Sequence, residues 1–235
     1  MNRREFLTSS ALLAGGATLA PSVVLGGDKA IAPVIKHRFF EVTLTHKILE
    51  KGDVAKLWLP LPLTSEYQSL ISKIENSGNY DEIYMSDFDI PTLYAKFSKE
   101  ERNITTKFSV ATIERNTDFS KVNFNENEKL SPEIAKYLEA TKTIQTDGAV
   151  KEKADEITKG IKGDLERARA IYDWVANTME RDESVVGCGV GDAKKILESG
   201  KLVGKCTDIN SVFVALCRSA GIPAREFFGI RLGES

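Results

Sequence analysis

Histidine is scarce in this sequence. Among 235 residues there are two histidines, His37 and His46, and both lie in the first fifth of the chain. Histidine is the side chain that most often acts as a general base, because its charge changes near neutral pH. A mechanism that needs a histidine beside a residue in the last third of the chain must therefore bring it from a distant segment or from outside this sequence.

The sequence also lacks an excess of either charge. Lysine and arginine total 32 against 34 for aspartate and glutamate, so the formal net charge is −2. Binding to nucleic acid or to an anionic membrane surface relies on a basic excess, so we expect neither as the main partner. No cluster of residues has metal-ligand spacing, and we expect no metal and no other cofactor. With 42% hydrophobic and 28% charged residues, the composition is that of a globular protein with a packed core.

The first 20 residues lack an apolar run long enough for a membrane-spanning helix, which needs about 20 such residues. Arg3 and Arg4 precede a short stretch rich in alanine, glycine and serine. Paired arginines before such a stretch are typical of a twin-arginine export signal, and we assign residues 1–32 to one. We therefore expect a periplasmic or otherwise exported protein without a membrane span in its mature form, and leave the cleavage site open.

Cysteine is also rare, with Cys188, Cys206 and Cys217. In an oxidising compartment, thiols usually pair unless they are buried or used in chemistry. An odd number leaves at least one of the three free.

Residues 33–125 alternate polar and apolar side chains with the period of a β-strand. Residues 40–45 and 55–61 flank a turn and predict one hairpin. Residues 93–97 and 104–113, joined by a polar segment, predict a second. Several short strands with polar turns favour a β-sandwich-like N-terminal domain.

Residues 130–235 carry helical spacing instead. The expected helices begin at Ser131-Pro132, follow Asp164 to Met179, occupy 193–199 after the cap Asp192, and span 206–220. The last helix is apolar nearly all round and should be buried on most sides, whereas 225–231 predict the start of a strand. The fold class is thus α+β, with a β-sandwich-like domain followed by helices whose core is incomplete.

Cys206 opens the buried helix, directly after Gly204 and Lys205. Unpaired N–H groups and the positive end of the dipole at a helix N-terminus favour the thiolate, and the lysine adds to this effect. The same N–H groups suit the oxyanion that forms when a thiolate attacks an amide, and Gly204 leaves space for a close approach of substrate. A cysteine at this position can equally be a small buried hydrophobe, and its position alone does not decide between the two.

Three residues near Cys206 are interpreted structurally. Asp208, in the first helical turn, is expected to accept N–H groups rather than to act as a catalytic acid. Cys217 lies about three turns further, some 16 Å along the helix, and is assigned to the core. Cys188 lies in the glycine-rich segment 186–191, which lacks the Lys-Ser/Thr ending of a phosphate-binding loop and predicts a flexible loop.

A long pattern surrounds these residues. It consists of Gly191-Asp192-Ala193, Leu197, Gly204-Lys205-Cys206-Thr207-Asp208, Phe213, Leu216, Arg218 and Ala220-Gly221-Ile222-Pro223-Ala224-Arg225. The pattern, together with the preceding helix around Tyr172-Asp173-Trp174-Val175, closely resembles the core of the transglutaminase-like superfamily, a papain-related group of cysteine enzymes. The resemblance covers about the last 75 residues. The β-rich part, with Trp58-Leu59-Pro60-Leu61-Pro62, is similar to the leader domain of some exported bacterial members.

The resemblance implies a Cys-His-Asp triad with Cys206 as the nucleophile and the histidine and aspartate on strands that follow. Neither partner can be assigned after Cys206 in this sequence, so residues 130–235 are expected to be the helical first half of a papain-like core, incomplete at the C-terminus and inactive as a fragment. His37 and His46 are expected to be structural residues of the β-domain. Arg218 and Arg225 are expected to pair with carboxylates.

Two functions remain open. The complete form would attack a peptide or glutamine amide of a peptide or protein substrate through a Cys206 thioester, by hydrolysis, deamidation or crosslinking. The alternative is a non-catalytic binding or structural module of the cell envelope that has kept the fold. The substrate, the acceptor and the oligomeric state stay open.

Overall fold

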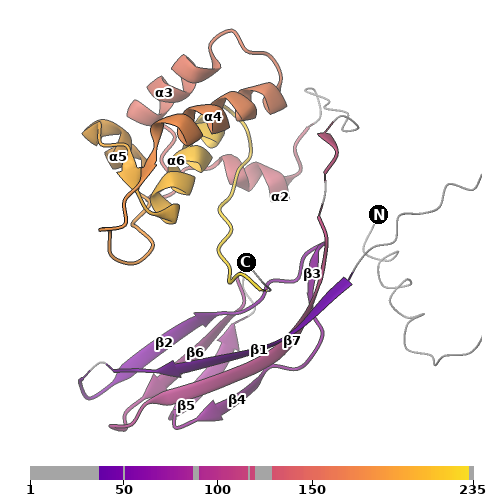
Figure 1. Cartoon of the computed structure of the whole chain (residues 1–235), viewed down its shortest axis with the longest axis vertical. Coiled ribbons are helices and arrows are strands. Elements are labelled where there is room, and N and C mark those ends of the chain that lie inside the picture. Colours follow the sequence, from indigo (N-terminus) through magenta and orange to yellow (C-terminus); the bar gives the residue numbers. More distant parts are fainter. Residues whose placement is uncertain (1–36, 50, 87–89, 116, 120–128, 233–235) are drawn as a thin grey trace, which may run out of the picture. The chain divides into compact units, whose positions relative to one another are not determined.

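The computed structural model describes residues 37–49, 51–86, 90–115, 117–119 and 129–232. The predicted export signal at residues 1–32 lies outside these described residues. The chain divides between Arg115 and Asn116 into a unit of strands and a unit of helices (Figure 1).

Antiparallel strands build the N-terminal unit. They are β1 (His37–Lys47), β2 (Ala55–Pro60), β3 (Gln68–Leu70), β4 (Glu75–Gly78), β5 (Glu82–Ser86), β6 (Thr92–Phe97) and β7 (Asn103–Ile113). One sheet has the order β1-β7-β3, with β4 also paired to β7, and the other has the order β2-β6-β5. Each pairing is antiparallel.

The two sheets share one apolar core, so this unit is a β-sandwich. Successive side chains of a strand point to opposite faces, and one face of each sheet is buried. Leu93 and Phe97 of β6 pack with Leu59 of β2 and with Ile104 of β7, which belongs to the other sheet. Leu93, Phe97 and Ile104 are fully buried, and each such side chain contributes about 1.5–3 kcal/mol. The predicted β-sandwich is confirmed.

Strands form where the sequence predicts them, but their pairing differs. β1 pairs along its whole length with β7, and β2 pairs with β6. Both predicted hairpins are therefore wrong, because each of their connections carries the chain from one sheet to the other. The alternation of polar and apolar residues predicts which side chains of a strand face the core. It does not predict the neighbouring strand, because the alternation is the same for every possible partner.

A buried arginine, Arg102, joins the β1–β2 connection to the β6–β7 connection. Arg102 is 5% exposed and immediately precedes β7. Its guanidinium donates to the carbonyl of Lys99 at 2.7 Å and to the carbonyl of Gly52, which lies between β1 and β2. Its own carbonyl accepts the N–H of Ile48 at 2.9 Å. A buried guanidinium requires such partners. Arg102 therefore holds together the β1–β2 connection and the β6–β7 connection, the two segments that carry the chain from one sheet to the other.

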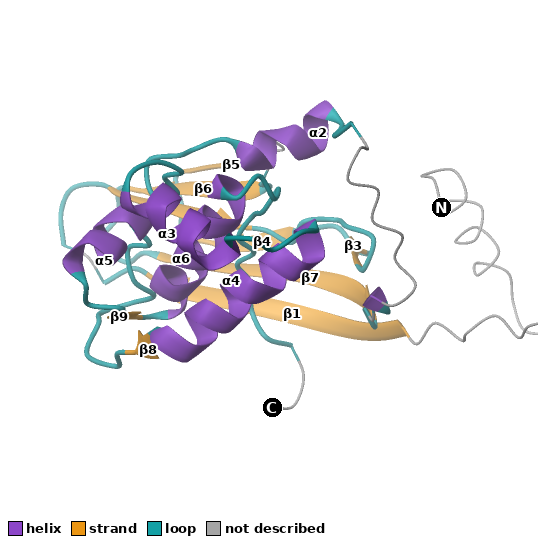
Figure 2. Cartoon of the chain, turned by 90° about the horizontal axis from the view of Figure 1, so that it is seen from above, coloured by secondary structure: helices purple, strands orange, loops and turns teal. Residues whose placement is uncertain are grey.

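Helices dominate the C-terminal unit (Figure 2). They are α2 (Pro132–Ala135), the 3-10 turn η2 (Lys136–Leu138), α3 (Ala149–Thr158), α4 (Asp164–Thr178), α5 (Ala193–Ser199) and α6 (Cys206–Ser219). Two short strands, β8 (Glu180–Arg181) and β9 (Val203–Gly204), pair in parallel. Within the described part of the chain, no helix is long and apolar enough to span a membrane.

Helix α6 is the centre of this unit. It contacts α3, α4, α5, β8 and β9, and both views of the ribbon show it among these elements. Val212, Ala215 and Leu216 are fully buried and belong to one core with Ile171 of α4 and Val150 of α3. The prediction of a helix buried on most sides is confirmed.

The ends of α5 are also as predicted. The Asp192 carboxylate accepts the N–H of Lys195 at 3.3 Å, and Gly200 ends the helix in the left-handed conformation with φ 66°. Helix α4 ends at Thr178, one residue before the predicted end at Met179, and its side chain Tyr172 is 55% exposed. The apolar face of this helix is centred on Ile171 and Val175.

Residues 225–231 form no strand in the described structure, contrary to the prediction. A strand needs a neighbour to bond its backbone groups, and alternating apolar residues alone do not supply one. The segment instead runs past α6, where the Ser211 hydroxyl donates to Glu226 Oε1 at 2.6 Å. Phe227, Phe228 and Ile230 are exposed.

Candidate active site

Cys206 is the first residue of α6, and its side chain is exposed. Lys205, in extended conformation, is the N-cap residue. The same helix buries its later side chains in the core of the unit. The helix therefore presents one thiol to solvent from a rigid, buried support.

Asp208 ties this end of the helix to the loop before α5. Its Oδ2 accepts the N–H of Lys205 at 2.9 Å, and its Oδ1 accepts the N–H groups of Val190 at 3.0 Å and Gly191 at 2.8 Å. Three backbone donors on one carboxylate hold the start of α6 and the loop together. The predicted structural role of Asp208 is confirmed.

Glycines let the loop lie against α6. Gly189 has φ +94°, and a Cβ there would lie 2.1 Å from Asp208 Oδ2. A Cβ on Gly191 would lie 2.5 Å from the Ser211 hydroxyl oxygen, and one on Gly204 would lie 2.5 Å from the Asp208 Cβ. The space at Gly204 is thus filled by Asp208 and not left for substrate, which corrects the sequence interpretation. The glycine-rich loop is also hydrogen-bonded to α6 rather than loose, because its glycines serve close packing.

The carbonyl of Cys188 lies over the start of the helix. It accepts the N–H of Thr207 at 3.0 Å, and the Cys206 sulfur lies 4.0 Å from it. One of the N–H groups expected to hold an oxyanion is therefore already bonded. Among the described residues, none accepts the N–H of Cys206 itself, which leaves this donor for a substrate oxygen.

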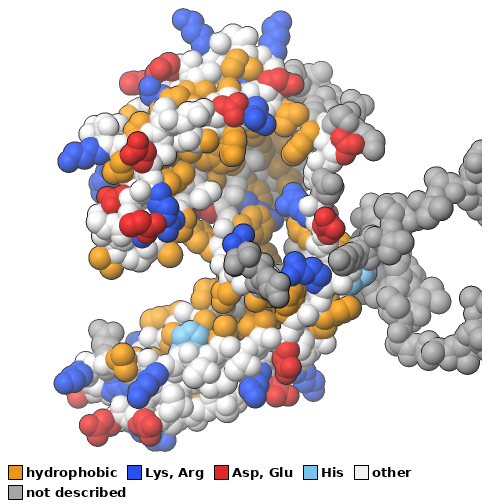
Figure 3. All heavy atoms as spheres, viewed as in Figure 1, with side chains coloured by type: hydrophobic (Ala, Val, Ile, Leu, Met, Phe, Trp, Pro, Cys, Tyr) orange, Lys and Arg blue, Asp and Glu red, His pale blue; other side chains and the backbone are white. Residues whose placement is uncertain are grey.

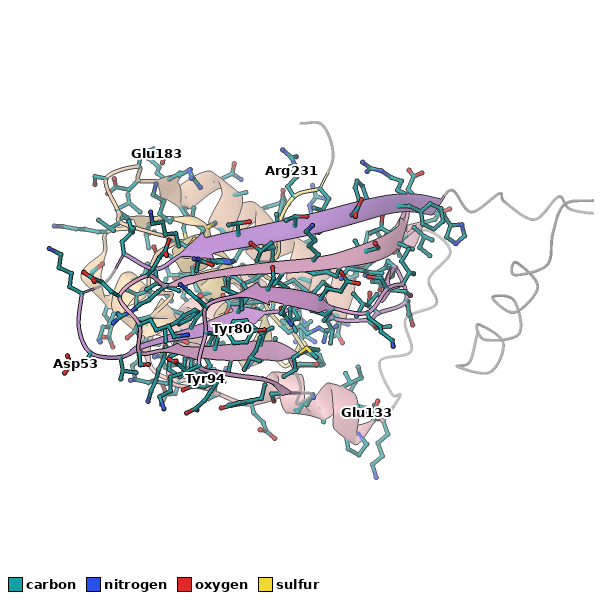
Figure 4. The ribbon with its side chains drawn as sticks, turned by 90° about the horizontal axis from the view of Figure 1, so that it is seen from below. Asp53, Tyr80, Tyr94, Glu133, Glu183 and Arg231 are labelled. Atoms are coloured by element: carbon teal, nitrogen blue, oxygen red, sulfur yellow. The ribbon has the colours of Figure 1, made fainter. Side chains whose placement is uncertain are left out.

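A charged cluster lies on the segments next to Cys206 in the chain and in the β8–β9 pair. Arg181 ends β8 and lies opposite Gly204 of β9, and the N–H of Asp182 donates to the Gly204 carbonyl at 2.9 Å. The Glu183 carboxylate accepts from both the Arg181 guanidinium and the Lys205 ammonium. Figure 4 labels Glu183, on the loop that follows β8. The side chain of Lys205 is 11% exposed, whereas that of Glu183 is 70% exposed.

The electrostatics of this cluster are consistent with its contacts. Hydrogen bonds from Arg181 and Lys205 lower the pKa of Glu183 to about 2. The bond to Glu183 is the main cause that raises the pKa of Arg181. Arg181 and Lys205 therefore hold the Glu183 carboxylate between them.

Sequence reasoning identified Lys205 but missed Arg181 and Glu183. Lys205 is adjacent to Cys206 in the chain, whereas the other two precede it by more than 20 positions. Only the parallel β8–β9 pair brings them together, and two-residue strands have no recognisable sequence period.

The other candidate residues lie elsewhere. Cys217 is 1% exposed in the core, as predicted, and burial raises the pKa of its thiol to about 12. Cys188 is exposed, and all three cysteines are free. His37 and His46 belong to β1 of the N-terminal unit. Within the described residues, no group of three or more histidine, cysteine or acidic side chains could hold a metal ion.

Arg218 and Arg225 form no ion pair with a carboxylate among the described residues, contrary to the expectation. Arg218 donates to the backbone carbonyls of Ala224 at 2.8 Å and Glu139 at 2.7 Å. Arg225 donates to the Tyr137 hydroxyl at 2.8 Å and lies over the ring of Phe227. Both arginines thus fasten the segment after α6 to the turn around η2, because carbonyl oxygens there need donors. On the face drawn in Figure 3, acidic and basic side chains are intermixed over the helices.

Comparisons with known proteins agree with this geometry. A protein of Haemophilus influenzae that carries the name "Uncharacterized protein" is 42% identical over 208 residues, which cover 83% of this chain and 56% of the relative. This chain therefore spans about half the length of that relative. The crystal structure of a "putative cysteine protease" from Cytophaga hutchinsonii has 16% identity and a TM-score of 0.58, covering 79% of this chain and 67% of the other. That likeness shows a common fold.

A family model matches the part of the chain that contains the exposed cysteine. The match runs over residues 151–235, from α3 through α6 to the segment that follows it. It includes the loop, the β8–β9 pair and the thiol described above. The family that this model describes is the transglutaminase-like superfamily, and residues 151–235 of this chain are similar to it.

Proposed function

We propose that Cys206 is the nucleophile of a cysteine enzyme that acts on amide bonds of a peptide or protein. The observation that carries this proposal is the exposure of Cys206 at the first position of an otherwise buried helix. A cysteine that only filled space would be buried, as Cys217 is on the same helix. The fold that this chain shares with the "putative cysteine protease" of Cytophaga hutchinsonii supports the same reaction class.

The chemistry is acyl transfer through a thioester. The Cys206 thiolate attacks the amide carbonyl carbon, forming a C–S bond and placing a negative charge on the carbonyl oxygen. In this proposal the N–H of Cys206 donates a hydrogen bond to that oxygen. The C–N bond then breaks, the amine takes up a proton and leaves, and the thioester is released to water or to a second amine.

The proton transfers need a general base and acid, a role that histidine fills most often. The two histidines of the sequence belong to the N-terminal unit, and residues 116–235 contain none. We propose that the histidine and aspartate of the triad lie beyond Ser235, in the order that the family resemblance implies. The 235-residue chain is then expected to be inactive alone.

The paired arginines near the start support a further part of this proposal. Arg3 and Arg4 precede a short stretch rich in alanine and glycine. We propose that they direct export, so that the enzyme would meet its substrates in the periplasm.

The test compares two cysteine variants in the protein expressed from its whole gene. Hydroxylamine is offered with a glutamine-containing peptide, and hydroxamate and ammonia are measured. Cys206→Ala should abolish both products, because no thioester can form. The control Cys188→Ala should retain them, because the Cys188 contact near the helix is made by its backbone carbonyl.

Activity that survives in Cys206→Ala would contradict the proposal. A protein that gives no product with either variant or with the wild type, yet binds peptides, would support a non-catalytic envelope module instead.

A further inference from the structure

Two exposed cysteines lie close together at the start of α6. The Cys206 sulfur is 4.0 Å from the carbonyl oxygen of Cys188, and the N–H of Thr207 donates to the same oxygen at 3.0 Å. Standard bond lengths along this path place the two cysteine Cα atoms at most about 7.8 Å apart, and any bend in the path brings them closer. Disulfides join Cα atoms that are about 4.4–6.8 Å apart. The backbone at the two cysteines is therefore near the separation that a disulfide needs.

One carboxylate holds the two segments that carry these cysteines. Asp208 accepts the N–H groups of Val190 at 3.0 Å and Gly191 at 2.8 Å, which follow the first cysteine in the loop. It also accepts the N–H of Lys205 at 2.9 Å, which precedes the second cysteine directly. The fold thus fixes where the two thiols lie relative to each other.

The third cysteine is kept out of such a reaction. Cys217 is 1% exposed, and burial raises the pKa of its thiol to about 12. Exchange between thiols and disulfides requires a thiolate that a reagent can reach. Cys188 and Cys206 are exposed and free, so both can react.

We propose that Cys188 is a redox modification site, which forms a reversible disulfide with Cys206 and so blocks the nucleophile. The disulfide follows from the placement of the two thiols, whereas its effect on activity rests on the proposed function of Cys206. While the S–S bond exists, Cys206 has no thiolate to attack an amide carbonyl. Reduction by a thiol restores it.

The oxidant would be a small organic disulfide such as oxidised glutathione. One cysteine thiolate attacks it, an S–S bond to the protein forms, and one glutathione thiolate leaves. The other cysteine thiolate then attacks the protein sulfur of this mixed disulfide and releases the second glutathione. The cysteine pair loses two electrons, the glutathione disulfide gains them, and the two thiol protons pass to the released thiolates.

The test treats the 235-residue chain with oxidised glutathione, blocks the remaining thiols with N-ethylmaleimide and analyses tryptic peptides by mass spectrometry. Trypsin cuts after lysine and arginine, so Cys188 falls in peptide 182–194 and Cys206 in peptide 206–218. Cys217 lies in the second peptide as well. Fragmentation of the linked peptides, together with the variant Cys217→Ala, distinguishes the two.

We expect a link between Cys188 and Cys206 in the wild type and in Cys217→Ala. With about 0.1 mM reduced glutathione present, the linked form should exceed the mixed glutathione disulfide about tenfold or more, because the effective concentration of a nearby thiol is of the order of mM. In concentrated urea, where the core is open, links to Cys217 should appear too.

A matched control moves the thiol within the loop. The double variant Cys188→Ser, Val186→Cys keeps the number of thiols, and the side chain at Val186 is 94% exposed and so contacts little of the chain. It should form about tenfold less linked product, because the new thiol is not held beside α6. An equal yield would overturn the proposal, since any thiol on the loop would then suffice.

Further outcomes separate this inference from the proposed function. Glutathione on Cys206 without a link to Cys188 would overturn the disulfide and leave the nucleophile proposal unaffected. In the protein expressed from its whole gene, linkage should stop product formation and dithiothreitol should restore it. A linked protein that keeps its full activity would contradict Cys206 as the nucleophile, while the disulfide would stand.

Discussion

Two thiols on helix α6 have opposite surroundings. Cys206 is exposed at its start, whereas Cys217 is 1% exposed and the pKa of its thiol is raised to about 12 by burial. The ordinary value is 9.0, so between pH 9 and 12 the folded chain keeps a proton that the unfolded chain releases. The contribution of Cys217 to stability is therefore complete below pH 9 and is lost as the pH rises towards 12.

Cys217→Ala tests this pH dependence. At pH 8 the free energy of unfolding of the variant should be about 1–2 kcal/mol lower than that of the wild type, because a small cavity is left in the core. Above pH 9 the wild type should lose about 1.4 kcal/mol per pH unit through this thiol, so the difference should narrow by pH 10.5. Urea unfolding at both pH values measures it, and a difference that does not change with pH would contradict the prediction.

Asp208 carries the second residue-scale prediction. Asp208→Asn keeps the shape but replaces one carboxylate oxygen by an N–H donor, so one of three backbone N–H groups loses its acceptor. We expect a loss of about 1.5–3 kcal/mol in the free energy of unfolding. Asp155→Asn, an exposed carboxylate on α3 paired with Lys151, should change it by less than about 0.5 kcal/mol. Equal effects of the two variants would argue against the anchoring role.

At the scale of elements, the loop before α5 offers a pair of glycines that differ in what surrounds them. Gly187 and Gly189 both have positive φ, at +71° and +94°. A Cβ at Gly187 would meet nothing within 4 Å, whereas one at Gly189 would meet the Asp208 carboxylate. The two positions share backbone strain but differ in packing.

Gly187→Ala should therefore cost only the strain of a left-handed residue, about 1–2 kcal/mol. Gly189→Ala should cost clearly more, because the loop must leave Asp208 and free the N–H groups of Val190 and Gly191. The comparison of urea midpoints measures the difference. If both variants lose the same stability, the loop does not depend on close packing against α6.

The same elements show how far the sequence predicts this fold. Caps and glycines determine the ends of α5 and α6, because a single local residue sets each end, and they were predicted correctly. The partners of the strands were not predicted correctly, because the pairing of β1 with β7 joins segments that are far apart in the sequence. Cys206 was proposed as the nucleophile from the sequence because its helix and the family pattern are local in sequence. Arg181 was missed because its place depends on the β8–β9 pair, which forms only in the folded chain.

At the scale of the whole molecule, export is the property that can be tested before any activity is known. Replacing both Arg3 and Arg4 by lysine should keep the precursor in the cytoplasm, if paired arginines are the export signal. Cell fractionation followed by immunoblotting measures the distribution, with Arg38→Lys in β1 as the control. Normal periplasmic levels of the double variant would contradict twin-arginine export and favour the general secretory route.

The central place of β7 in its sheet also affects how the N-terminal unit is made. Residues paired between β1 and β7 are 56 to 76 positions apart, and β3 and β4 pair with β7 as well. At a synthesis rate of about 5–20 residues per second, β1 waits about 3–15 seconds for its partner. During that time the apolar side chains of β1, such as Val42, have no sheet to join, and folding of this unit is slowed by a long loop closure. The ribosome therefore releases the first strand of this sandwich well before the strand that completes it.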